Sequence, residues 1–539
     1  MTTLLPVDRD DEPDSASTSS MSPSTLDLLV LTFNCAKNLI NPGVFATHLA
    51  SAFGHNATEL PDLVVFSLQE IAPLSQAFIG DYFLNPYVAR FDEAINLAAA
   101  LQQQPQQDVV SVTPTEGGTS NERRYTLARA HNVGYTAILL FARDPARIRD
   151  LQEAEVGFGA AEMGNKGAVG LRALYDAGKE GDEAQTTELT FVATHLAAME
   201  WNLPRRNANW AAIMRGLTFD NPEAVVQRMR GREGTSSSSS AAAAAAAAGS
   251  SSEDEADDEG QGEESERHRL LHDHHHRRHL ELQRQLHDIS VFKPSSHLFV
   301  AGDLNYRIST VSPEPNAAFP SLDPASEHYY PTFFPLDQLT RERAAGRTMH
   351  GLTEHEVRFP PTYKYDIQGG HHDGGDDEDD DAPVPWTFAP HRYPSWTDRV
   401  LYLDLPPWVK TGDGDATPRM RVRGYDALPV VRTSDHRAVF LRVDVPLIPP
   451  SRLAPPETRS PVRGSEDSAD ADATVRATDP RVRLPVEIDP EAWERRKAAR
   501  QKEKLLGWSM FLWSTREGAL VLATLLVAGV GGYWMYKWA

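Results

Sequence analysis

Short apolar runs recur along most of this chain, and each has the length of one β-strand. They fall at residues 26–33, 62–68, 133–142, 168–175, 189–194, 298–301, 400–405 and 438–445. Helical patterns occur between some of these runs, notably at 81–101 and 202–217. Many strands with few intervening helices predict an α/β fold in which two packed sheets are covered by helices.

Other parts of the 539-residue chain are too polar to join such a core. Residues 236–252 are a run of serine and alanine, and acidic stretches at 253–266 and 373–381 hold 16 of the 76 carboxylates. We therefore expect a disordered segment at 1–25, a linker at 446–487, and three insertions near 102–121, 231–288 and 368–383. Most of the net charge of −23 then belongs to loops, and this acidity disfavours nucleic acid as a partner.

Two further features of composition limit the possibilities. The only cysteine, Cys35, excludes a disulfide framework and a cysteine-based zinc site, so we expect a reducing compartment. The acidic N-terminus lacks the basic start and apolar run of a signal peptide. The second insertion contains a histidine tract, for which we favour a solvated helical loop over a metal site. That tract consists of His272, His274, His275, His276 and His279.

The C-terminal stretch 518–536 is free of charge and long enough to cross a hydrocarbon core of ~30 Å at ~1.5 Å per residue. Tryptophan and tyrosine residues bracket it, and a basic juxtamembrane segment at 488–517 precedes it. This pattern predicts a transmembrane tail anchor with the rest of the protein in the cytosol. Three glycines in the span favour a thin bilayer such as the endoplasmic reticulum. The alternative, a buried C-terminal core helix, is disfavoured because nothing follows that would cover its far side.

The segment 302–307, with the sequence GDLNYR, follows the apolar run 298–301 and so presents polar groups at a strand end. Asp303 and Asn305 are two residues apart, and their side chains point to the same side if the extended geometry continues. One is a potential base, and the other is an amide that can hold a water or an oxyanion. A strand-ending Asx turn is the alternative, and it would be favoured if this segment stood alone.

Five further polar clusters follow apolar runs, and they contain Asn34, Glu70, His195, Asp398, and Asp435 with His436. These side chains converge if their strands belong to neighbouring sheets. Glu70 and Asn34 offer the carboxylate and amide oxygens that a hard divalent cation prefers. Asp303 with Asn305 suits a base and a positioning amide for a nucleophilic water.

Histidines complete this inventory. His436, if held by Asp398, can bind or protonate a phosphate oxygen, and His195 offers a second donor. Carboxylates, amides and histidines in this combination match metal-assisted hydrolysis of a phosphoester.

Seven phrases, taken in order, resemble the inositol polyphosphate 5-phosphatase family. They lie at 61–71, 164–170, 194–198 with 205–207, 302–308, 359–365, 394–399 and 434–437. The resemblance covers about 26–445 apart from the insertions. Some phrases mark the wider deoxyribonuclease-I-like superfamily, whereas GNKG and FPPTYK are peculiar to the 5-phosphatases. One catalytic domain followed by a tail anchor is similar to the small fungal 5-phosphatases of the endoplasmic reticulum.

This resemblance implies a four-layer αββα sandwich with the site at one rim between the sheets. It implies that Glu70 and Asn34 hold magnesium and that Asp303 activates the water. Asn305 would then stabilise the transition state. The remaining catalytic residues implied are His436 with Asp398 at the scissile phosphate, together with His195 and Asp435.

The resemblance also implies a set of substrate-binding residues. Lys166, Tyr363 and Lys364 are similar to residues that grip the neighbouring 4-phosphate, although a surface salt bridge is an alternative for Lys364. Three further residues are implied at the same cleft, namely Asn165, Arg206 and Asn207.

We therefore interpret the sequence as that of a monomeric, tail-anchored, magnesium-dependent phosphatase. The expected reaction removes the 5-phosphate of phosphatidylinositol 4,5-bisphosphate, a lipid substrate held in the membrane. One alternative is a phosphodiesterase of the same superfamily, of the nuclease or sphingomyelinase type. Another is a catalytically silent tether that binds phosphoinositide headgroups.

Overall fold

The computed structural model describes residues 24–103, 123–178, 185–230, 260–368, 384–410, 418–456 and 479–539. Most of the predicted N-terminal segment lies outside these ranges. The same holds for most of the first and third insertions and for the centre of the predicted linker.

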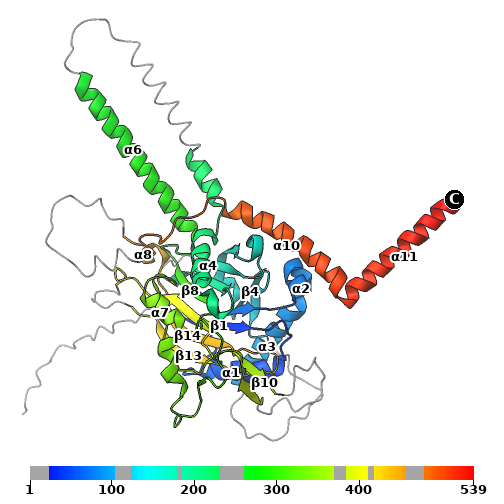
Figure 1. Cartoon of the computed structure of the whole chain (residues 1–539). Coiled ribbons are helices and arrows are strands. Elements are labelled where there is room, and N and C mark those ends of the chain that lie inside the picture. The colour runs from blue at the N-terminus through cyan, green and yellow to red at the C-terminus, as the bar shows by residue number, and fades with distance from the viewer. Residues whose placement is uncertain are drawn as a thin grey trace, which may run out of the picture.

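The fold is built on two six-stranded sheets (Figure 1). The first sheet has the order β13-β14-β1-β2-β4-β3, and the second has the order β5-β6-β7-β8-β12-β9. Strands of the first sheet are β1 (Thr25–Asn34), β2 (Leu63–Gln69), β3 (Thr126–Val133), β4 (Thr136–Ala142), β13 (Arg421–Ala427) and β14 (Val439–Pro446). Strands of the second are β5 (Ile148–Gly157), β6 (Gly167–Asp176), β7 (Thr186–His195), β8 (His297–Asp303), β9 (Leu352–Thr353) and β12 (Asp398–Leu403). A separate hairpin pairs β10 (Tyr365–Ile367) with β11 (Trp386–Phe388).

Three buried apolar clusters define four layers. The central cluster lies between the sheets and joins residues such as Val30 of β1 to Phe299 of β8. The second cluster packs α1 (Pro42–Gly54) and α3 (Asn85–Gln103) against the outer face of the first sheet. The third packs α4 (Leu203–Gly216) against the outer face of the second sheet. Because each sheet is buried on both faces, its central strands are continuous apolar runs. The predicted four-layer α/β sandwich is confirmed.

The helices follow from local signals in the sequence. Asn41 caps α1 by accepting hydrogen bonds from the amides of Gly43 and Val44, and Pro42 occupies the first turn, where its missing amide costs nothing. Phe45, Leu49 and Phe53 recur every four residues and form the buried face of α1. The helices predicted at 81–101 and 202–217 are present as α3, with a short 3₁₀ turn before it, and as α4.

The sequence patterns missed four strands at sheet edges, β3, β5, β9 and β13. β9 has only two residues, and the other three carry polar side chains at many positions, as in the sequence IRDLQEAEVG of β5. Edge strands pair on one side only and expose more of their side chains, so they lack a continuous apolar run. Further helices are α2 (Leu74–Ile79), α6 (Gly260–Ile289), α7 (Gln338–Ala344), α8 (Pro450–Leu453), α10 (Ala492–Ser514) and α11 (Arg516–Trp538).

The region that follows β14 differs from the predicted free linker. Leu447, Ile448 and Leu453 are buried, and the buried guanidinium of Arg481 donates to the carbonyls of Leu403 and Asp404. The basic segment also packs, because α10 contacts α2 and β5. Two arginines of this segment pair with carboxylates of the domain, Arg495 with Glu162 and Arg496 with Glu155.

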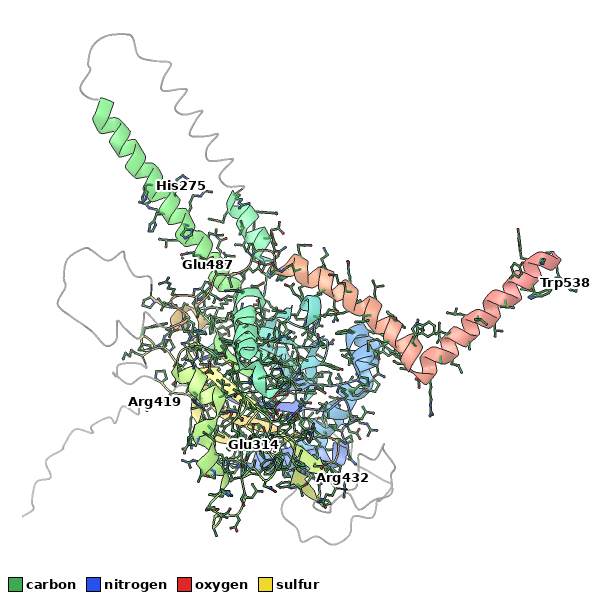
Figure 2. The ribbon with its side chains drawn as sticks, in the orientation of Figure 1. His275, Glu314, Arg419, Arg432, Glu487 and Trp538 are labelled. Carbon is green, nitrogen blue, oxygen red and sulfur yellow. The ribbon has the colours of Figure 1, made fainter. Side chains whose placement is uncertain are left out.

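Two helices project from the body of the domain (Figures 1 and 2). The histidine tract lies on α6, and His275 is exposed there. Trp538 lies at the far end of α11, away from the sheets. Within the described residues, α11 is the helix long and apolar enough to cross a membrane, with a mean hydropathy of 1.7 and 6% of its apolar window buried.

Candidate active site

Six strands bring the predicted polar groups to one rim of the sandwich. β1 pairs in parallel with β2, and β7 pairs in parallel with β8, so the carboxyl ends of each pair coincide. Asn34, His195 and Asp303 are the last residues of β1, β7 and β8. β12 and β14 run antiparallel to β8 and β1 and therefore begin at the same rim. Asp398 begins β12 opposite Asp303, and His436 precedes β14.

The buried Asp303 carboxylate lies at the centre of the site. Its Oδ2 accepts a hydrogen bond from Asn34 Nδ2 at 3.1 Å and lies 3.3 Å from His195 Nε2. The Asn305 amide donates to Oδ1 at 3.0 Å. Burial by itself would raise the pKa of Asp303, but the His195 hydrogen bond and the nearby charges of His436 and Lys166 hold that pKa well below its usual range. Asp303 is therefore ionised.

His436 and Asp398 form a buried pair beside this carboxylate. His436 Nδ1 lies 2.9 Å from Asp398 Oδ2, which also accepts from the Thr362 hydroxyl at 2.7 Å. Burial lowers the pKa of His436, but the charges of Asp398 and Asp303 and the Asp398 hydrogen bond outweigh it and raise the pKa to about 10. The Tyr363 ring lies against the imidazole with centroids 4.4 Å apart. His436 is therefore protonated and held in one orientation.

Glu70 and Asn34 fit a hard divalent cation. Glu70 follows β2 with φ of 47°, and Lys37 Nζ lies 2.8 Å from its Oε2. Burial would raise the pKa of Glu70, but the charges of His195 and Lys37 lower it, so the carboxylate is ionised and has a cation beside it. The side-chain nitrogen of Asn34 donates a hydrogen bond to Asp303. Its side-chain oxygen accepts one from the backbone amide of Ala36. A carboxylate and an amide oxygen are ligands that such a cation prefers.

A second set of ligating atoms lies close by. Atoms of Asp303, Asp398 and His436 lie within 4.8 Å of one another, and Asp398 Oδ1 is buried without a hydrogen-bond partner. A buried carboxylate oxygen without a hydrogen-bond partner can accept a cation or a hydrogen-bond donor.

Three cationic side chains face the same rim. Lys166 Nζ contacts His195 Nε2, and burial lowers the pKa of Lys166 to about 8 despite the attraction of Asp303. Lys364 pairs with Asp435, so a salt bridge considered from the sequence is present, and its partner is one of the predicted catalytic residues. Arg307 lies over the Tyr363 ring at 4.3 Å and donates to Asn305. Sequence reasoning gave Arg307 no role, although it lies inside the GDLNYR segment.

The structure does not place Arg206 and Asn207 as substrate ligands. Arg206 is fully buried and donates to the carbonyls of Ala197 and Met199 and to Gln338 Oε1. Asn207 donates to Glu342 and accepts from Tyr306, so its amide is also occupied inside the domain. Arg206 thus holds the loop after β7, whereas Asn207 connects Glu342 of α7 to Tyr306.

The Asn165 side chain lies in a closely packed loop. Its side chain is half-buried, and its Oδ1 has no hydrogen-bond partner. A Cβ added at Gly159 would overlap that oxygen, so the 158–166 loop is closely packed around Asn165.

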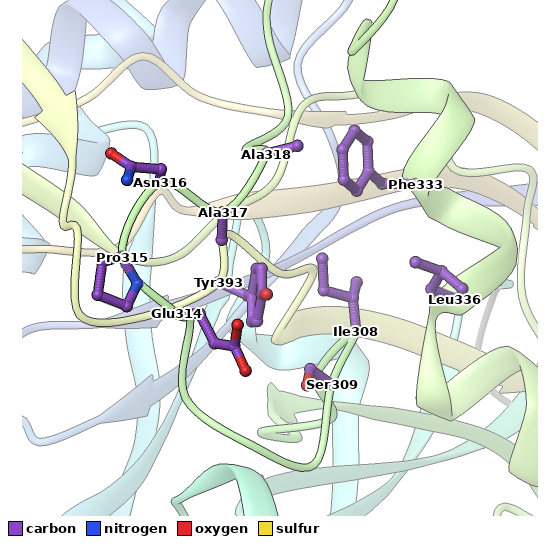
Figure 3. A pocket seen from close by; sticks show the side chains of 10 residues that line it. All are labelled: Ile308, Ser309, Glu314, Pro315, Asn316, Ala317, Ala318, Phe333, Leu336 and Tyr393. Carbon is purple, nitrogen blue, oxygen red and sulfur yellow. The ribbon is translucent and has the colours of Figure 1, made fainter.

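A cavity of about 490 Å³ lies beside this site but is distinct from it (Figure 3). Ile308, Phe333, Leu336 and Tyr393 contribute its apolar lining, and Glu314 lies at its edge. None of the predicted catalytic residues lines it.

This rim of carboxylates, amides and histidines between two packed sheets holds the kinds of group that hydrolysis of a phosphate ester requires. The chain belongs to the Endonuclease/Exonuclease/phosphatase family 2, whose model matches residues 31–442.

Named relatives confirm the resemblance to inositol polyphosphate 5-phosphatases. The chain is 24% identical over 423 residues to the polyphosphatidylinositol phosphatase INP53 of Saccharomyces cerevisiae, covering 78% of this chain and 26% of that protein. It is 24% identical over 381 residues to the inositol-1,4,5-trisphosphate 5-phosphatase 1 of Schizosaccharomyces pombe, covering 67% and 24%. The chain thus spans about a quarter of the length of these relatives.

A solved structure is also similar, namely the inositol polyphosphate 5-phosphatase domain of SPsynaptojanin in complex with inositol (1,4)-bisphosphate and calcium ion. It is 19% identical, with a TM-score of 0.45, and the match covers 79% of this chain and 85% of that one.

Proposed function

We propose that this protein is a magnesium-dependent phosphatase that removes the 5-phosphate of phosphatidylinositol 4,5-bisphosphate. The observation that carries the proposal is the 3.3 Å contact of His195 with Asp303, on the rim where His436 pairs with Asp398. This arrangement supplies an ionised base at the end of β8 and a protonated donor just before β14, which belongs to the other sheet. Relatives named as phosphoinositide and inositol phosphate phosphatases support the choice of substrate class.

The residues of the rim suit hydrolysis of a phosphate monoester by water. Asp303 is ionised and accepts a proton from the attacking water, while Asn305 and His195 fix the direction of its carboxylate. His436 hydrogen-bonds Asp398 through Nδ1, which leaves Nε2 to donate to a phosphate oxygen. The positive charge of the imidazole then stabilises the transition state. Glu70 and Asn34 would hold the magnesium ion, which supplies positive charge to the phosphate when bound.

The cations of the rim support a substrate with a second phosphate. Lys166 and Lys364 belong to separate loops, and a monoester with a neighbouring phosphate would give both a ligand. Arg307 and Lys364 both lie over the Tyr363 ring, at 4.3 and 5.5 Å from its centroid. A phosphodiester substrate, as in a nuclease, would carry less charge and would need fewer cations.

Membrane attachment forms the second half of the proposal. Helix α11 is exposed along its length and has the apolar composition of a spanning helix, so we propose that it anchors a monomeric enzyme in the endoplasmic reticulum membrane. Fluorescence microscopy of a tagged 488–539 tail tests this location. Accumulation of the tail in mitochondria would contradict it.

Phosphate release by the full chain in detergent micelles tests the activity. With magnesium, we expect release from phosphatidylinositol 4,5-bisphosphate and none from the 4-monophosphate lipid. The Asp303→Ala variant should release no phosphate, whereas Asp366→Ala, which removes an exposed aspartate of β10, should match the wild type. Equal release by the wild type and Asp303→Ala, or none from any 5-phosphorylated substrate, would overturn the proposal. Cleavage of a phosphodiester instead would identify a phosphodiesterase.

A further inference from the structure

A carboxylate on the basic helix α10 is completely buried against the catalytic domain. Both oxygens of Glu503 are used: Oε1 accepts from the Gly164 amide at 2.7 Å and from Arg496 at 2.6 Å, and Oε2 accepts from Arg496 at 2.8 Å. Arg496 is also buried, and it donates to Glu155 of β5 at 2.9 Å. This helix lies outside residues 31–442, which match the family model.

The backbone amide that Glu503 holds belongs to the loop that carries Lys166. Gly164 precedes Lys166 by two residues, and Lys166 Nζ contacts His195 in the active site. The loop has no other amide bonded to a side chain of α10 within the described residues. A charged acceptor makes a stronger hydrogen bond to an amide than a neutral one does. Glu503 therefore fixes the backbone from which Lys166 extends.

The same loop is linked to the metal-ligand segment through backbone hydrogen bonds. The Gly164 carbonyl accepts from the Tyr135 amide at 3.2 Å, and the Tyr135 carbonyl accepts from the Ile71 amide at 3.3 Å. Ile71 directly follows Glu70. One row of hydrogen bonds thus runs from Glu503 on α10 to the neighbour of Glu70.

Close packing makes this row rigid. A Cβ at Gly164 would lie 2.9 Å from the Gly134 amide nitrogen, and Gly134 itself has φ of 49°. α10 also packs closely on α2, because a Cβ at Gly507 of α10 would lie 2.9 Å from Phe78 Cβ of α2. α2 begins only four residues after Glu70. No side chain fits at these contacts without moving the backbone, so a shift of α10 is transmitted to both loops.

We propose that Glu503, held by Arg496, is a positioning residue for the active site. Through this contact α10 holds in place the loop that carries Lys166. The proposal rests on the proposed phosphatase function, in which Lys166 binds a substrate phosphate. α10 leads through Thr515 directly into α11, so the helix that positions Lys166 also connects the domain to the membrane anchor.

Kinetics of the full chain in detergent micelles, with magnesium and phosphatidylinositol 4,5-bisphosphate, test this role. For Glu503→Ala, we expect KM to rise at least fivefold while kcat falls by a smaller factor. Glu503→Gln keeps one acceptor oxygen for the Gly164 amide and should recover part of the loss. The matched control is Glu494→Ala, which removes an exposed acid of the same helix and should leave both constants unchanged.

Hydrogen exchange measured by mass spectrometry gives a readout that does not depend on activity. The peptide covering 158–166 should exchange slowly in the wild type and at least tenfold faster in Glu503→Ala, with Glu503→Gln between them. A purely structural role would lower Tm and leave KM unchanged.

Three results would overturn the proposal. They are fast wild-type exchange at 158–166, unchanged exchange in both Glu503 variants, or a kcat/KM of Glu503→Gln and Glu503→Ala within twofold of the wild type. If the wild type itself releases no phosphate, the phosphatase function fails, while the exchange result still decides whether Glu503 holds the loop. The two failures are therefore distinguishable.

Discussion

His195 Nε2 lies 3.3 Å from Asp303 Oδ2, across the parallel ladder that pairs β7 with β8. Both residues are the last of their strands, so the register of one ladder brings a histidine and a carboxylate together. Strand ends of a buried sheet are rigid, and they hold polar groups more precisely than free loops do.

The Asp303 carboxylate should be essential for catalysis. Replacing it by asparagine keeps the volume of the side chain but removes the charge that accepts a proton from water. We expect kcat to fall by about 10³-fold or more, in the range known for removal of a catalytic base. Release of inorganic phosphate measures this loss. A fall of less than tenfold would exclude Asp303 as the base.

The His436 and Asp398 pair should act as one unit. Either His436→Asn or Asp398→Asn leaves a buried partner unpaired, so each single change should cost most of the activity. The double variant should then lose little more than either single variant, because interacting residues are not additive. Single-turnover kinetics of the three variants measure the coupling. Strict additivity of their effects would contradict a functional pair.

Removal of divalent cations should abolish activity, and magnesium should restore it. A chelator would remove the ion and leave the Glu70 carboxylate paired with Lys37. The Glu70→Gln variant should need at least tenfold more magnesium for half-maximal rate, since an amide oxygen is a weaker ligand for a hard cation. A magnesium titration of both proteins checks this expectation. An identical titration curve would place the ion elsewhere.

The buried His297 should make the fold sensitive to acid. Burial lowers its pKa from 6.5 to about 3 in the folded protein. Below pH 6.5 the unfolded chain binds a proton that the folded chain does not, so stability falls as the pH drops from 6.5 toward 3. At pH 5 the loss is about 2 kcal/mol, at about 1.4 kcal/mol per pKa unit.

Urea unfolding at pH 7 and pH 5 tests this prediction. The drop in the free energy of unfolding between the two pH values should be about 2 kcal/mol smaller in His297→Leu than in the wild type. The matched control is His328→Leu, because His328 is 44% exposed and should leave the drop unchanged. An equal drop in all three proteins would refute the role of His297.

The amino-acid pattern was enough to predict the central strands and the polar residues at their ends for which we propose catalytic roles. Leu63–Gln69 and His297–Asp303 are apolar because both faces of each sheet are covered, and a polar residue can follow only where the strand reaches solvent. Local pattern and motif therefore located Asp303, Glu70 and His436. They missed the edge strand β5, whose side chains are largely polar because one of its sides has no partner strand.

Which of these residues contact one another follows from the packing of the strands and not from any local pattern. Asn34 and Asp303 are 269 residues apart and hydrogen-bonded, and no local pattern records that distance. The structure also assigned Arg206 to internal carbonyls and brought Glu503 of a basic helix to the Gly164 amide. The partners of a side chain depend on how distant segments pack. The residues that flank Arg206 or Glu503 in the sequence therefore do not predict which groups contact them.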